Sequence, residues 1–148
     1  MLPGKRLSRT ISMLPELHPL FIHFPIALFS AAIFFDVFFI LLKKPENMVV
    51  GWWVMLLALV SSAAAIATGI IDDTLIGHLG SVFPIWVNHG WVQIVSSFVF
   101  LILFIWRNHN PLFYETPKLK WLYLITGSTG IALLFYGGHL GAKLAGRI

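Results

Sequence analysis

The sequence contains no cysteine and few charged residues. The absence of Cys from its 148 residues excludes disulfide bridges, thiolate metal sites, iron–sulfur ligation and c-type haem attachment. Charged residues make up 11% of the chain, whereas a soluble domain carries about 25%. Hydrophobic residues make up 58%, and the mean hydropathy is +0.86. A core this small cannot hide so much apolar surface, so a soluble monomer is excluded, and so is a disordered chain.

The sequence also lacks the motifs of several enzyme and nucleic-acid-binding classes. Candidate nucleophiles such as Ser30, Ser61 and Ser96 have no nucleophile elbow or triad context. The chain has no phosphate-binding glycine loop. In an apolar protein the net charge of +4 belongs mostly to loops and tails and does not indicate nucleic acid. We therefore expect no hydrolase or transferase activity and no nucleic-acid partner.

Four long apolar stretches are present, at about residues 20–42, 49–71, 86–106 and 119–140. Each reaches the length of about 20 residues that a membrane-spanning helix requires. Tryptophan lies near the expected ends of these spans, as interfacial anchors do, at Trp52, Trp53, Trp86, Trp91, Trp106 and Trp121. The sequence predicts an all-α integral membrane four-helix bundle with both termini on the same side. The bundle would occupy residues 18–142, between an N-terminal tail (1–17), expected to lie along the membrane interface, and a basic tail (143–148).

The two ends of this bundle differ in their polar residues. We call the end with both termini and the loop at 72–85 end A, and the end with the two basic loops end B. Lys and Arg are tied at five against five, with Lys5, Arg6, Arg9, Lys143 and Arg147 at end A and Lys43, Lys44, Arg107, Lys118 and Lys120 at end B. The end A loop has two Asp and no Lys or Arg, which favours end A outside the cytoplasm.

Five of the six histidines gather at end A, namely His18, His23, His78, His89 and His139, together with Asp72 and Asp73. Ionisable groups at membrane depth are costly and usually have a function. Each span also carries a polar or small stripe at helical spacing, and such stripes normally face the bundle interior. The stripes are His23-Ala27-Ser30, Ser61-Ala65-Thr68-Asp72, His89-Gln93-Ser96 and Ser128-Ala132-Phe135-His139. They predict a polar interior that opens toward end A.

Two ionisable residues lie toward end B. Asp36 falls inside the first span, and we expect it to pair with Lys43, Lys44, Arg107 or Lys120, with a proton-relay role as the alternative. His109 is expected to be a solvated loop residue.

Four motifs carry a family resemblance: LHPLFIHFPIALF at Leu17–Phe29, TGIIDD at Thr68–Asp73, NHGWVQ at Asn88–Gln93 and GGHLGAKL at Gly137–Leu144. With them the chain resembles, over about residues 15–145, the bacterial "domain of unknown function 2231" family of four-helix membrane proteins. The matching motif positions are His18, Pro19, His23, Pro25, Asp72, His89, Gly137 and Gly138. The resemblance implies a multi-pass protein of the bacterial inner membrane. Relatives fused to Rieske-type or cytochrome c-type domains imply a setting in membrane electron transfer, with membrane or periplasmic subunits as partners.

The first functional hypothesis is a redox subunit that binds one haem b. Haem in a four-helix bundle requires two axial ligands from facing helices and room for the macrocycle. His23 and His89 are the preferred pair, and His139 could replace either. Gly130 and Gly137 could let the porphyrin approach the fourth span.

Two alternatives remain open. A transition-metal ion could be held by imidazole and carboxylate ligands, drawn from His23, His89, His139, Asp72 and His78. Otherwise the chain is a cofactor-free structural or assembly subunit of a larger membrane complex, in which the His and Asp side chains hold the helix ends together. An electron-transfer or accessory role is favoured over catalysis, and the sequence leaves an oligomer open.

Overall fold

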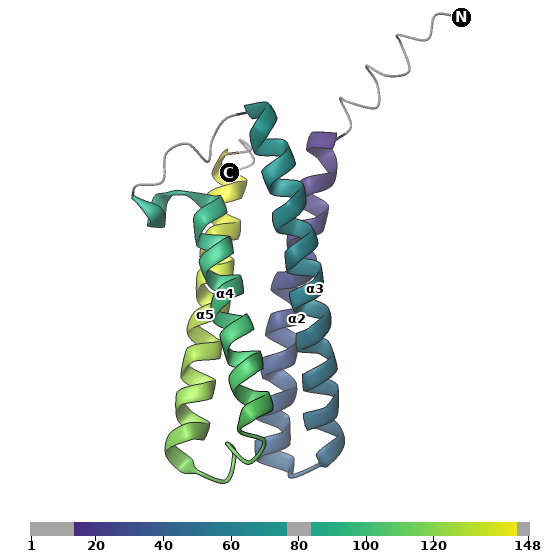
Figure 1. Cartoon of the computed structure of the whole chain (residues 1–148), viewed down its shortest axis with the longest axis vertical. Coiled ribbons are helices and arrows are strands. Elements are labelled where there is room, and N and C mark those ends of the chain that lie inside the picture. The colour runs from purple at the N-terminus through teal and green to yellow at the C-terminus, as the bar shows by residue number, and fades with distance from the viewer. Residues whose placement is uncertain (1–13, 77–83, 145–148) are drawn as a thin grey trace, which may run out of the picture.

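The computed structural model describes residues 14–76 and 84–144, and these form a bundle of four long helices (Figure 1). The helices are α2 (Leu14–Leu42), α3 (Pro45–Ile76), α4 (His89–His109) and α5 (Pro117–Leu144), and the short 3-10 helix η1 (Ile85–Val87) precedes α4. All four contain apolar segments long enough to cross a membrane, which confirms the predicted all-α membrane bundle.

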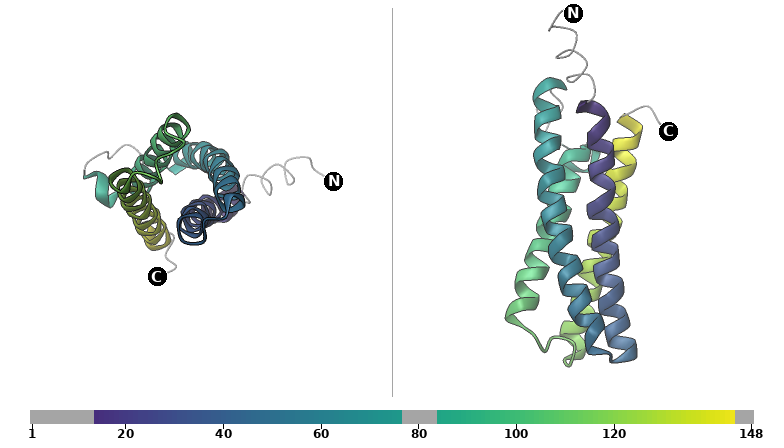
Figure 2. Two further views of the ribbon diagram at one scale, coloured as in Figure 1. Left: turned by 90° about the horizontal axis from the view of Figure 1, so that it is seen from below. Right: turned by 90° about the vertical axis from the view of Figure 1, so that its right-hand side faces the viewer.

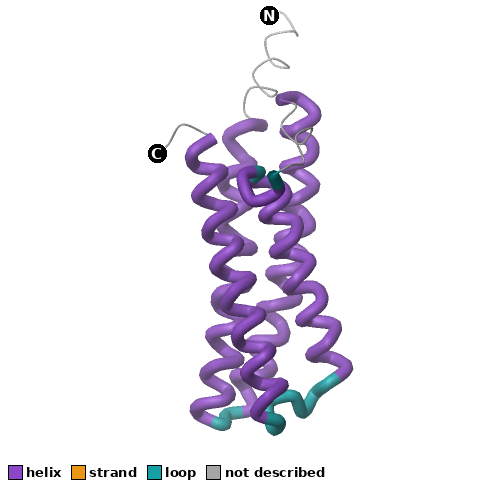
Figure 3. Tube along the Cα trace, turned by 90° about the vertical axis from the view of Figure 1, so that its left-hand side faces the viewer, coloured by secondary structure: helices purple, strands orange, loops and turns teal. Residues whose placement is uncertain are grey.

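The helices form two antiparallel hairpins, α2–α3 and α4–α5. Seen along the bundle axis, they are arranged around a ring in the order α2, α3, α4, α5 (Figure 2). The two connections within the hairpins lie together at end B, whereas the N-terminus of α2 and the C-terminus of α5 lie at end A (Figure 3). This is the arrangement that the four predicted spans require.

Local sequence signals set the helix ends and shift them from the predicted spans. Lys43 ends α2 in the left-handed conformation, with φ of 56°, and its N–H donates to the Phe39 carbonyl at 2.8 Å. Pro45 and Pro117 occupy the first positions of α3 and α5, where a missing N–H costs nothing. The Asn88 side chain caps α4 by accepting from the Trp91 N–H at 3.3 Å, so this helix begins at His89 instead of Trp86.

The core lies on the bundle axis and is mainly aromatic and aliphatic. Phe29 of α2 stacks on Phe100 of α4 with ring centroids 4.0 Å apart, and both side chains are fully buried. At end B, Phe113 folds inward from the loop between α4 and α5 and contacts Tyr123, with ring centroids 4.6 Å apart. The interior of the described bundle is therefore filled by side chains from its centre to end B.

Glycines on α5 allow its neighbours to approach closely. A Cβ atom at Gly127 would lie 2.5 Å from Cδ1 of Ile33 on α2, and one at Gly130 would lie 2.9 Å from Cε2 of Phe100 on α4. Small residues at such contacts are the usual device of helix packing in membranes, where dispersion replaces the hydrophobic effect.

Candidate functional site

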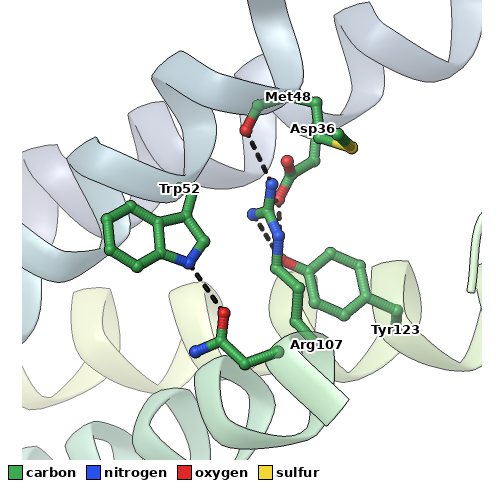
Figure 4. A network of polar contacts seen from close by, with 6 residues as sticks. Asp36, Met48, Trp52, Arg107 and Tyr123 are labelled. Carbon is green, nitrogen blue, oxygen red and sulfur yellow. Dashed lines mark hydrogen bonds and ion pairs between the residues drawn. The ribbon is translucent and has the colours of Figure 1, made fainter. Parts of the chain in front are cut away.

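A buried ion pair joins α2, α4 and α5 near end B. The guanidinium Nη1 of Arg107 donates to Oδ2 of Asp36 at 2.8 Å, and the Tyr123 hydroxyl donates to the same carboxylate oxygen at 2.6 Å (Figure 4). The Asp36 side chain is 2% exposed and that of Arg107 is 5% exposed. Because the two charges cancel and are hydrogen-bonded, the bundle can hold them at membrane depth.

The same arginine also ties α3 to the pair. Its Nη2 donates to the Met48 carbonyl at 2.8 Å, within the first turn of α3 (Figure 4). Beside it, Nε1 of Trp52 donates to Oδ1 of Asn108 at 2.7 Å, which is a second link between α3 and α4. All four helices are thus connected at end B by this polar network.

Of the four cations predicted as partners of Asp36, Arg107 is the one that pairs with it. The sequence pattern assigned Arg107 to a linker, but α4 continues to His109 and carries the Arg107 side chain into the bundle. Tyr123 was not predicted, although its place near the expected end B of the fourth span is a signal that could have found it. His109 is exposed as predicted, but it is the last residue of α4 and not part of a loop.

At end A, His89 is held against α5. Its Nδ1 lies 2.8 Å from the Gly137 carbonyl, which can only accept, so Nδ1 carries the proton and the lone pair of the neutral ring is on Nε2. The ring edge occupies the notch at Gly141, where a Cβ atom would lie 2.9 Å from Cε1 of His89. This bond fixes both the orientation and the tautomer of the imidazole.

The other predicted ligands lie elsewhere or cannot be placed. The side chains of His23 on α2 and His139 on α5 are exposed. His78 and the side chain of Asp72 fall outside the described residues. Among the side chains that the structure describes, no group of three or more His, Cys, Asp or Glu residues could hold a metal ion.

The stripe on α4 points into the bundle as predicted, and the stripe on α3 does so at Ala65. On α4, Ser96 is buried and Gln93 donates from Nε2 to the Leu134 carbonyl at 3.2 Å. On α3, Ala65 is buried, and Ser62, on the same side of the helix, shares a 2.6 Å hydrogen bond with Ser97 of α4. These contacts pair Gln93, Ser62 and Ser97 with groups on neighbouring helices.

The prediction is wrong for α5 and for most of the stripe on α2. Ser128, Ala132, Phe135 and His139 are all exposed, because α5 instead turns its glycine-rich face toward the core. That face carries Gly127, Gly130 and Gly137, which permit closer helix contact than the polar stripe would. On α2, His23 and Ala27 are exposed and Ser30 is partly buried.

Side chains occupy the two glycine faces that were expected to receive a porphyrin. Gly130 faces the edge of the Phe100 ring, and a Cβ atom at Gly137 would lie 3.0 Å from Nε2 of Gln93 and 3.1 Å from Cγ1 of Val92. In this arrangement the α4–α5 contact leaves no room for a macrocycle at either glycine.

The family model described as "Predicted membrane protein (DUF2231)" matches residues 15–148, which is nearly the whole chain. The chain belongs to this family. Comparison of this DUF2231 protein with curated proteins and with solved structures finds no match. The membership agrees with the four spanning helices and with contact between the protein and a lipid bilayer.

Proposed function

We propose that this DUF2231 protein is an accessory subunit of a larger membrane complex, without a cofactor between its helices. The observation that carries the proposal is the outward stripe on α5, formed by Ser128, Ala132, Phe135 and His139. Small and polar residues within a spanning helix usually face another helix. Lipid chains form no hydrogen bonds with their polar groups, and they pack less closely against small side chains than a second helix does. Since the stripe faces none of the other helices that the structure describes, a helix of another protein is the partner that fits it.

The filled interior from the centre of the bundle to end B supports the same proposal. The Phe29–Phe100 stack fills the middle of the bundle, and Asp36, Arg107 and Tyr123 satisfy one another at end B. In such a bundle, the outer faces of the helices are the surfaces that contact neighbouring proteins.

Site-specific photo-crosslinking in membranes of the native host tests this role. A photoreactive amino acid at Ala132 should give a discrete crosslinked product, because this position lies within the outward stripe. Leu133 is the matched control, since it lies at nearly the same depth but about 100° further around α5. No product from Ala132, or the same products from both positions, would contradict the proposal.

A second candidate is a redox subunit that carries haem b, or a transition-metal ion, at end A. The observation in its favour is the hydrogen bond from Nδ1 of His89 to Gly137, since ligating histidines almost always donate their second ring nitrogen to a carbonyl or carboxylate. Bis-His ligation by His89 and His139 would require a different packing of α5 at end A, since the exposed His139 side chain lies on the face of α5 opposite its buried glycines. The His23 side chain is also exposed, and ligation by His89 and His23 would require it to turn toward α4.

The two candidates make opposite predictions for the visible spectrum. If the protein carries haem b, His89→Ala or His23→Ala abolishes the haem bands while His109→Ala leaves them unchanged. A full haem signal in both ligand variants would refute this ligand pair. Stoichiometric metal without haem bands would instead favour the metal site.

A further inference from the structure

A pocket of about 260 Å³ opens beside the polar network at end B. It lies between the N-terminal turns of α3, the last turn of α4 and the loop that follows. Most of its wall is apolar or aromatic, and its polar groups come from Arg107 and Asn108. The lining residues are Met48, Val49, Trp52, Arg107, Asn108, Pro111 and Phe113.

The polar groups of this pocket are hydrogen-bond donors. A guanidinium has five N–H groups, and the bonds to Asp36, Tyr123 and Met48 account for three of those of Arg107 among the described residues. Asn108 accepts from Trp52 through Oδ1, which turns its amide N–H groups away from the indole. A ligand in this pocket therefore meets donors and must supply acceptors.

The charge of the pocket is also balanced. Asp36 neutralises Arg107 and is almost completely buried, so its carboxylate is shielded from a ligand. An anion would gain little from an arginine that is already paired, and a cation would find no accessible carboxylate. An uncharged acceptor, such as a carbonyl oxygen, fits this environment.

The position and size of the pocket restrict the ligand further. Trp52 provides an aromatic wall for a flat ring, and the nearly buried Phe113 contributes a small part of the lining. The volume suits one substituted ring rather than a large cofactor. Val49 is 53% exposed at the mouth, on the lipid-facing surface near the tryptophans of end B. An apolar tail could therefore remain in the bilayer while the ring enters.

We propose that this pocket binds the headgroup of a membrane quinone. The ring lies against Trp52, and a ring carbonyl accepts hydrogen bonds from Arg107 and Asn108. The site lies at the opposite end of the bundle from His89 and is independent of the accessory role proposed above.

Photolabelling of the purified protein tests this site. The protein is reconstituted in phosphatidylcholine nanodiscs, illuminated with a short-chain azidoquinone, and digested for peptide mapping. We expect saturable labelling within residues 48–52 or 107–113 that excess unlabelled quinone prevents. Labelling spread evenly over the lipid-facing helices would overturn the proposal.

Two adjacent valines provide a matched pair of variants. Val49→Trp fills the mouth of the pocket and should reduce specific labelling about tenfold, whereas Val50→Trp, also exposed but outside the lining, should leave it unchanged. Asn108→Leu removes the amide donor and also the acceptor that holds the Trp52 indole, and it should weaken quinone binding by about two- to tenfold. Equal labelling of the two Trp variants would refute the site.

A phospholipid is the competing occupant. Repeating the labelling in nanodiscs rich in anionic phosphatidylglycerol distinguishes the two sources of the carbonyl acceptor. Labelling that is unchanged by the anionic lipid supports the quinone, whereas labelling abolished by it assigns the pocket to a phospholipid headgroup and overturns the proposal.

Discussion

Replacing Arg107 by leucine should destabilise the bundle more than any surface substitution at end B. The change removes the ion pair with Asp36 at 2.8 Å and the hydrogen bond to the Met48 carbonyl at 2.8 Å. It leaves the Asp36 carboxylate, which is 2% exposed, without a cation inside the membrane-spanning region. Removing one partner of a buried ion pair typically costs about 3–5 kcal/mol.

The double variant Asp36→Leu/Arg107→Leu should lose much less than the sum of the two single variants. Each single change leaves an uncompensated buried charge, whereas the double change leaves two apolar side chains of similar volume, and such replacements are often nearly neutral. The expected coupling between the two sites is therefore about 2–4 kcal/mol, well above the limit of about 0.5 kcal/mol for independent sites.

Helix unfolding in mixed micelles of mild detergent and SDS, followed by circular dichroism, gives these free energies. Lys118→Met serves as the control, because Lys118 is exposed at the same end, and it should change stability by no more than about 0.5 kcal/mol. Two results would refute the conclusion that this ion pair stabilises the bundle: additive effects of the two single variants, or a cost of Arg107→Leu as small as that of the control.

The same unfolding measurement checks three further predictions. Gly51→Ala should cost about 1–3 kcal/mol, since its Cβ atom would lie 2.6 Å from Oδ1 of the buried Asp36. Gly138→Ala should be tolerated, because its Cβ atom would make an ordinary 3.4 Å contact with Ile26. Equal effects of the two variants would contradict the close α2–α3 contact. Ser62→Ala should cost about 0.5–1.5 kcal/mol through the lost bond to Ser97, and no loss in either single alanine variant would argue against this α3–α4 link. His89→Ala should cost about 1–2 kcal/mol without any cofactor, because it removes the hydrogen bond to the Gly137 carbonyl and leaves the space beside Gly141 empty. His109→Ala is the control and should not change stability, because the His109 side chain is exposed.

Hydropathy was sufficient to predict the number and type of the helices, but local chemistry decided where they end. The apolar runs predict four spans because a membrane helix has a minimum length. The ends moved by a few residues where Pro45 and Pro117 start a helix, and where Asn88 caps α4 after a 3-10 turn. These shifts matter for the packing of the bundle, since the extension of α4 to His109 brings Arg107 inside it.

The face that a helix turns inward was harder to predict. On α5 both the polar stripe and the glycine face have helical spacing, and periodicity alone does not rank them. The rule that polar residues face inward favoured Ser128 and His139, but the glycines at 127, 130 and 137 allow α2 and α4 to come closer. The expected convergence of His89 and His139 depended on that choice, and so His89 lies at the α4–α5 contact while His139 lies on the outward face of α5.

The charge and depth of Asp36 narrowed its possible partners but did not identify the one it has. Charge and depth reduced the partners to four cations, because a carboxylate in a membrane span needs one. The choice among them depended on helix rotation, which the sequence alone did not provide. The Tyr123 and Met48 contacts follow from that same rotation.

A reduced-minus-oxidised visible spectrum, with metal analysis of the same sample, tests the central claim most directly. The protein should be purified from native membranes in mild detergent, with its helix content verified. An accessory subunit without a cofactor predicts no haem bands and no stoichiometric metal. Sharp α and Soret bands with one haem per chain would contradict this account and establish the redox subunit instead.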